Sequence, residues 1–293
     1  MIGGFAVIVS GLGAALTWGL GDFAGGLASR RAAAMQVVLV SQPAGAAVLV
    51  ALGVVLRQPA PRLADLLWGV AAGLLGGMGL LLLYLSLARG KMGVAAPLTA
   101  IASGGIPLVV GLLTEGLPGP TQIGGFLLAA PALWLISRPD EADDFHPRDA
   151  LLPLLAGVGF GGFMALIGQV SEDAGFIWPL VATRLASITM LSGVWLVGNA
   201  RSHYRETFGE GLTGAVLPFP WALALLAGLG DTAGNAFYAL TVQTGRLDVA
   251  AVLGALYPAA TVLLARLVLD ERLTAPQSVG VVLALGAVVL IAL

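Results

Sequence analysis

The chain has 293 residues, of which 58% are hydrophobic and only 10% are charged, and its mean hydropathy is +0.96. A soluble domain carries about 25% charged residues, so this composition excludes a soluble globular protein and indicates an integral membrane protein. The net charge of −2, without a basic stripe, argues against nucleic-acid binding. The absence of cysteine excludes disulfides and thiolate metal sites.

Ten apolar runs follow one another along the chain, each close to the ~20 residues that a transmembrane helix needs. The first run starts without a preceding basic segment, which favours a first transmembrane helix over a cleaved signal peptide. The ten predicted helices cover residues 5–25, 33–56, 63–87, 92–113, 120–136, 150–170, 176–198, 217–242, 247–269 and 276–293.

Glycine is abundant, with 42 residues, and the third run contains the ladder Gly69, Gly73 and Gly77. Glycines at i, i+4 and i+8 share one helical face and predict close packing against another helix. The segment Gly-Lys-Met at 90–92 is not a phosphate-binding loop, because methionine stands where Ser or Thr is needed and the earlier glycine is missing. We therefore expect no ATPase activity and no requirement for an ATPase subunit.

Two motifs occur twice, in the same order, in the two halves of the chain. The pattern GKxxVAA that starts at Gly90 recurs as GRxxVAA at Gly245. The pattern ExLxxPxxxG that starts at Glu115 recurs at Glu271. The nearly constant separation of the copies indicates an internal duplication.

Each copy would hold five of the ten predicted helices, so the second copy enters the membrane in the opposite orientation. Inverted repeats of this kind occur in secondary transporters, with the substrate site near the midplane where the repeats meet. The sequence therefore predicts an all-α integral membrane protein with ten transmembrane helices in two inverted five-helix repeats. The predicted domains are a first repeat over 1–137, a polar linker over 138–149 and a second repeat over 150–293.

The eighth predicted helix carries the clearest functional signal. Its apolar run contains Asp231, Asn235 and Tyr238 at i, i+4 and i+7, which places a carboxyl, an amide and a phenol on one face. A carboxylate exposed to hydrocarbon costs ~2.5–3.5 kcal/mol on insertion scales, so this face is expected to look into protein or a water-filled cavity. It either lines a substrate pathway, which we favour, or fastens the helix to a neighbour as a buried polar network.

Two other predicted helices contribute charged candidates. In the first, Trp18 and Asp22 lie at i and i+4, and Asp22, near the end of the predicted helix, either lines the pathway or reaches the membrane interface. In the seventh, Arg184 lies deep in an apolar run. Its guanidinium suits a substrate carboxylate or a structural ion pair with Asp231 or Asp22. The ion pair is the favoured interpretation, because a buried cation needs an anion even without substrate.

Tyr84, Ser103 and Tyr257 complete the candidate pathway residues. Tyr84 in the third helix aligns next to Tyr238 in the duplicate, and Ser103 and Tyr257 lie at corresponding depths in the fourth and ninth helices. These side chains either face a cavity or, for the tyrosines, serve in packing or at the membrane interface.

The distribution of Lys and Arg predicts an orientation. Most of them fall on the side of the odd-numbered connectors, whereas the other side holds only Arg57, Arg62 and Arg246. By the positive-inside rule the odd-numbered side is cytoplasmic, and both termini lie outside.

The segments YPAAT at 257–261 and DERLTAPQSVG at 270–280 resemble the end of an EamA domain, in which a YP helix runs into a G/D-E-x-L loop and a final helix with a spaced glycine. Glu115 begins the same loop in the first copy, and Trp18-Gly19 resembles the tryptophan–glycine pair of the family's first helix. The resemblance covers both halves. It implies membership of the drug/metabolite transporter superfamily, with the YddG-like amino-acid exporters as the most similar characterised members.

This resemblance implies ten helices in two inverted repeats around a central cavity that opens to one side at a time. It also implies cytoplasmic termini, the opposite of the charge count, so both orientations stay open.

We expect a secondary transporter that exports small metabolites, with neutral or aromatic amino acids as the substrates, by alternating access. The alternatives are export of lipophilic cations, drugs or other metabolites, with Asp231 or Asp22 as the counter-charge, and a structural membrane subunit. Without an HExxH, GxSxG or paired-aspartate motif, no enzyme is expected. We expect no cofactor, no metal and no nucleic-acid partner. The expected protein is a monomer that spans a bacterial inner membrane several times, coupled to protons or working by facilitated diffusion.

Overall fold

The computed structural model describes residues 2–88, 92–136, 150–171, 175–199, 218–269 and 274–293. These residues form helices and no strands. The predicted linker 138–149, the first residues of two of the repeated motifs (90–91 and 271–273) and both histidines lie outside the described residues. The domain limits therefore remain a prediction. The helices are α1 (Ile2–Ser29), α2 (Ala34–Val55), α3 (Leu63–Ala88), α4 (Met92–Thr114), α5 (Pro120–Ile136), α6 (Leu151–Ile167), α7 (Ile177–Asn199), α9 (Trp221–Thr244), α10 (Leu247–Gly254), α11 (Tyr257–Leu269) and α12 (Ala275–Ala292).

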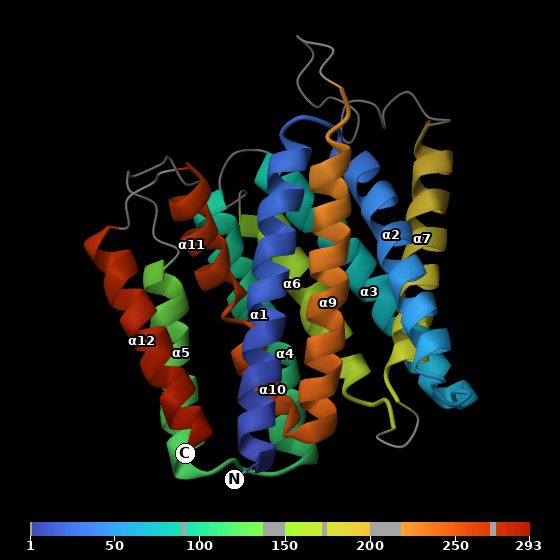
Figure 1. The fold of residues 1–293 in the computed structure, drawn as a ribbon. Helices are drawn as coiled ribbons and strands as arrows, with labels where there is room; N and C mark the ends of the chain where they lie inside the picture. Colours follow the sequence, from blue (N-terminus) through green and yellow to red (C-terminus); the bar gives the residue numbers. More distant parts are fainter. Residues whose placement is uncertain (1, 89–91, 137–149, 172–174, 200–217, 270–273) are drawn as a thin grey trace.

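These eleven described helices make ten crossings of the bundle, because α10 and α11 together form one crossing (Figure 1). Five of them, namely α1, α2, α3, α7 and α12, are long and apolar enough to span a membrane by length and composition. Large apolar side chains such as Leu127, Val282 and Leu285 are exposed on the outer surface, as lipid-facing positions are. The predicted all-α membrane fold is confirmed.

The contacts between helices come in pairs, and exchanging the two halves of the chain converts one contact of a pair into the other. α1 packs along α9, and its counterpart α6 packs along α3. Likewise α2 packs on α9 as α7 packs on α3, and α4 packs on α6 as α10 and α11 pack on α1. In Figure 1, α1 and α6 run through the bundle in opposite directions, and both ends of the described chain lie on the same face, called the termini face below. Two inverted five-helix copies produce this pattern, and they bring α1, α3, α6 and α9 together in the interior.

The glycine ladder of α3 forms the predicted close-packing face. A Cβ atom on Gly73 would collide with the backbone oxygen of Thr183 in α7, and a Cβ atom on Gly77 would lie 2.5 Å from Cβ of Ser187. Small residues permit this approach of two helix backbones in a membrane. The ladder therefore fixes α7, and with it Arg184, against the centre of the bundle.

The sequence predicts one continuous ninth helix over 247–269, but the structure shows a broken one. It is interrupted at Ala255 and Leu256, between α10 and α11. Pro258, at the start of α11, has no N–H to donate to the carbonyl of Gly254, and a proline ring clashes with that carbonyl in a regular helix. The local bonds instead join Leu256 N to Leu253 O at 3.2 Å, a tighter turn, so the crossing breaks near its middle.

Which face is cytoplasmic stays a prediction. Much of the charge difference rests on Lys91, Arg138, Arg201 and Arg272, and these lie outside the described part of the chain.

Candidate functional site

Two small adjoining cavities lie among the central helices. The first has a volume of about 40 Å³ and the second about 30 Å³. Phe160, Phe163, Asp231 and Asn235 line both of them. The first is lined in addition by Trp18, Asp22, Ser103, Met164, Gly254, Ala255 and Tyr257, and the second by Gln42, Gly73, Gly76, Gly77, Leu80, Thr183, Arg184 and Ser187.

Cavities of this size hold only a few water molecules, since one water needs ~10–15 Å³. They are walled by helices from both halves of the chain, with α1, α4, α6, α9 and the α10–α11 break around the first and α2, α3, α6, α7 and α9 around the second. A larger solute therefore requires the helices to move apart.

The polar face predicted on the eighth helix, which is α9, exists, but its three side chains bind three different neighbours. Asp231 Oδ2 pairs with Nη1 of Arg184 on α7 at 2.5 Å. Asn235 Oδ1 accepts a 2.8 Å hydrogen bond from the indole Nε1 of Trp18 on α1. Tyr238 donates its phenol hydrogen to a backbone oxygen of α6 at 3.1 Å. α9 is therefore bonded to three other helices, α1, α6 and α7.

Arg184 is almost fully buried, with 4% of its side chain exposed, against 16% for Asp231. Its Nη1 also donates to Oε1 of Gln42 on α2 at 2.9 Å, and Ser187 donates to the same oxygen at 2.8 Å. Of the two predicted ion-pair partners of Arg184, Asp231 and Asp22, the structure shows Asp231. The Nη2 end of the guanidinium is buried and has no hydrogen-bond partner among the described residues.

Asp22 lies well inside α1, which continues to Ser29, so it does not sit at the helix end as the sequence predicts. The predicted helix was too short because Arg30 and Arg31 follow the apolar run closely. The Asp22 carboxylate lines the first cavity, and no hydrogen bond or ion pair to it occurs within the described residues. The carboxyl groups of Asp22 and Asp231 are close enough to interact electrostatically.

Ser103 and Tyr257 line the first cavity as well. Ser103 donates to a carbonyl of its own helix at 3.0 Å, whereas the Tyr257 hydroxyl is buried and has no partner in the described part of the chain. Tyr257 opens α11 beside the helix break, so the break itself forms part of the wall.

Tyr84 and Tyr238 line neither of the two cavities. Both are fully buried, and Tyr84 packs against Gly25 of α1, where no Cβ could be accommodated. The Tyr238 ring lies 5.5 Å from that of Trp18 at 34°. These two tyrosines act in packing, with Tyr238 supporting the Trp18 ring that forms the cavity wall.

Several lining residues are not evident from the sequence. Gln42 carries a signal, because it is an uncharged polar residue within an apolar run. Phe160, Phe163 and Met164 carry none, because apolar residues on α6 look the same whether they face lipid or a cavity.

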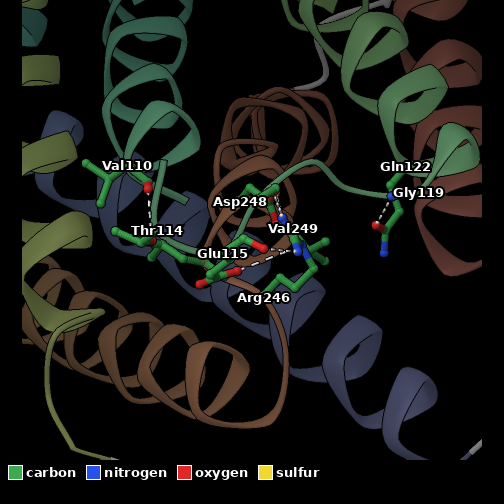
Figure 2. Close-up of polar contacts among 10 residues, drawn as sticks. Val110, Thr114, Glu115, Gly119, Gln122, Arg246, Asp248 and Val249 are labelled. Carbon is green, nitrogen blue, oxygen red and sulfur yellow. Dashed lines mark hydrogen bonds and ion pairs between the residues drawn. The ribbon is translucent and has the colours of Figure 1, made fainter. Parts of the chain in front are cut away.

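A second polar network lies at the termini face and joins the two halves of the chain (Figure 2). Arg246, between α9 and α10, donates from Nε and Nη2 to both oxygens of Asp248, at 3.0 and 2.7 Å. The same guanidinium donates to the backbone oxygen of Gly116 at 2.6 Å. Glu115 accepts hydrogen bonds from the backbone N–H of Leu247, at 3.1 and 3.2 Å.

The hydrogen bond to Asp248 raises the pKa of the Arg246 guanidinium, so this side chain stays charged throughout the physiological pH range. Its partner Asp248 has a fully buried side chain. The network ties the α4–α5 connector to the start of α10.

The chain is similar to known proteins in two comparisons. Residues 148–293 match the EamA-like transporter family. A solved structure titled "Crystal structure of protein" has a TM-score of 0.74 to this chain at 14% sequence identity, over 98% of each chain; at this identity the likeness shows the fold alone. Among curated proteins none matches the chain in sequence.

Proposed function

The chain belongs to the EamA-like transporter family, and from that premise we propose that it exports neutral and aromatic amino acids by alternating access through its central cavities. The family makes it an integral, multi-pass membrane transporter of small molecules. The amino-acid substrate, the direction and the mechanism are our proposal.

The observation that carries the proposal is the position of the polar cavities between the two inverted halves. The first cavity is walled by α1 and α4 from one half and by α6, α9 and the α10–α11 break from the other. Secondary transporters with inverted repeats bind substrate at such a place, beside interrupted helices, and expose it by rocking one part against the other.

The lining supports an amino acid more than a phosphorylated solute. It combines aromatic rings, two amides and hydroxyls with Asp22, Asp231 and one guanidinium, that of Arg184. A phosphate group would call for several Arg or Lys side chains in the pathway. We further propose that the protein works as a monomer in a bacterial inner membrane, without an ATPase subunit.

The proposal is tested by reconstituting the full chain in liposomes and following labelled neutral amino acids. We expect flux above that of empty vesicles, saturable and competed by related amino acids. An imposed pH gradient separates proton coupling from facilitated diffusion. If none of the neutral amino acids moves faster than in empty vesicles, the amino-acid proposal is wrong.

One observation favours a second candidate, export of lipophilic cations. Asp22 lines the first cavity without a described partner, and Trp18, Phe160 and Phe163 supply aromatic surface around it. A lipophilic cation that is carried faster than every neutral amino acid would favour this candidate over the first.

A further inference from the structure

We propose that the two cavities recognise a free amino acid by its two charged ends, with the Asp22 carboxylate binding the ammonium group and Nη2 of Arg184 binding the carboxylate. This inference rests on the amino-acid transport proposed above and names the groups that select the substrate.

Most polar groups of the first cavity already have partners inside the protein. Asn235 Oδ1 accepts from an indole N–H, Asp231 pairs with a guanidinium, and Ser103 donates to a carbonyl of its own helix. Asp22 differs from them, because its carboxylate faces the cavity with no hydrogen bond or ion pair from the described residues. On the same wall, the buried hydroxyl of Tyr257 also has no partner within the described part of the chain.

Arg184, which lines the second cavity, has an unused donor of the opposite charge. Arginine has five N–H donors, and Nη1 of Arg184 contacts Asp231 and Gln42. Nη2 is buried and donates to no described residue. The large majority of buried polar atoms in proteins have a partner, so this N–H pair marks a position for an acceptor atom of a ligand.

The charges of the site select a zwitterion. Of the acidic and basic residues that line the cavities, Arg184 and Asp231 pair with each other, and Asp22 is the acidic group left over, whose ionised form the ammonium group of a ligand would stabilise. A simple amine would neutralise Asp22 but leave Nη2 without an acceptor. A simple carboxylate would bind Nη2 but would bring no cation to the carboxyl group of Asp22. An amino acid satisfies both groups.

The position of the cavities allows one ligand to reach both groups. The two cavities adjoin, because four residues line both of them, namely Phe160, Phe163, Asp231 and Asn235. A ligand that occupies both cavities would therefore have Asp22 in the wall of the first and Arg184 in the wall of the second. The two phenylalanines and Trp18 supply apolar surface for the side chain. The lining therefore fits a neutral amino acid with an apolar or aromatic side chain.

The test is equilibrium binding of labelled L-phenylalanine to the purified full-length protein. Two competitors each lack one charged end, namely 2-phenylethylamine and 3-phenylpropanoate. Because each end makes a charge-assisted hydrogen bond, we expect each competitor to bind about ten- to a hundredfold more weakly than L-phenylalanine.

Asp22→Asn is expected to weaken L-phenylalanine and 2-phenylethylamine about tenfold or more, and to leave 3-phenylpropanoate unweakened. Arg184→Gln should weaken L-phenylalanine and 3-phenylpropanoate and leave 2-phenylethylamine unweakened. Because Arg184→Gln alone leaves Asp231 unpaired and endangers folding, the double variant Arg184→Gln/Asp231→Asn, which keeps a neutral pair, is measured beside it. The matched control is Asp65→Asn, which removes a buried carboxylate outside both cavities and is expected to leave L-phenylalanine binding unchanged.

Wild-type affinity for L-phenylalanine in Asp22→Asn, or competition by both analogues as strong as that by unlabelled L-phenylalanine, would overturn the inference while amino-acid transport stands. If 2-phenylethylamine binds as tightly as L-phenylalanine, the site is a cation site and Arg184 has no role in recognition. If the wild-type protein binds neither L-phenylalanine nor any other neutral amino acid, the proposed function is wrong, and this inference with it.

Discussion

Arg184 on α7 and Asp231 on α9 form the ion pair at the centre of the bundle, with 2.5 Å between Nη1 and Oδ2. Gln42 accepts from the same guanidinium, so the pair also holds α2. Helices of both halves thereby meet at one point beside the cavities, and the two side chains hold these helices together.

The first prediction concerns this ion pair. Arg184→Gln leaves the Asp231 carboxylate unpaired, and breaking a buried pair in this way costs ~3–5 kcal/mol. We expect a clear fall in the Tm of the detergent-purified protein. The double variant Arg184→Gln/Asp231→Asn has no unpaired charge and should recover most of that fall. Equal Tm values for the single variant and the wild type would contradict the structural role of the pair.

The second prediction concerns the network at the termini face. Arg246→Ala leaves the fully buried Asp248 without its guanidinium and removes the bond to Gly116, so among the described residues only the bonds from Leu247 to Glu115 still hold the α4–α5 connector to α10. We expect this face to open more often. The chain has no cysteine, so a single Val249→Cys change on buried α10 gives a clean probe, and its labelling by a water-soluble maleimide should be faster with Arg246→Ala.

The control for that experiment is Arg57→Ala. Arg57 is exposed on the connector between α2 and α3, so its removal also takes away one positive charge but should leave the labelling rate unchanged. Equal labelling rates with and without Arg246 would show that the network does not hold this face closed.

The third prediction concerns the glycine ladder. Gly73→Ala places a Cβ atom against the backbone oxygen of Thr183 and must push α3 from α7. We expect a lower Tm. Gly193→Ala on α7 is the matched control, because a Cβ atom there meets nothing within 4 Å, and the higher helix propensity of alanine adds ~1 kcal/mol at most. The prediction is wrong if both variants have the same Tm.

The fourth prediction concerns the break between α10 and α11. Pro258→Ala restores an N–H that can donate to the carbonyl of Gly254, so the two helices can join into one. Because this break forms part of the wall of the first cavity, we expect slower substrate flux in liposomes with an unchanged or higher Tm. Normal flux would mean that the break has no part in transport.

The sequence by itself determined the membrane fold, because the length and polarity of each run depend only on neighbouring residues. Helical periodicity likewise placed Asp231, Asn235 and Tyr238 on one face of α9, and the repeated motifs indicated the two inverted halves. Periodicity also placed the glycine ladder on one face of α3. These features are local, or recur along the chain, and need no knowledge of which helix lies beside which.

Only the tertiary structure decided which groups meet. The sequence offered Arg184 two acidic partners, Asp22 and Asp231, and the packing paired it with Asp231. Trp18 likewise donates a hydrogen bond to Asn235 of the other half of the chain, because helix packing brings together residues far apart in sequence. The effect of each proline was decided in the same way. α2 and α5 stay whole through Pro43 and Pro131, whereas the ninth crossing breaks before Pro258, although a proline removes the same hydrogen bond in each. Neighbouring helices determine whether the freed backbone groups are satisfied within a kinked helix, and the packing therefore placed the break at the cavity.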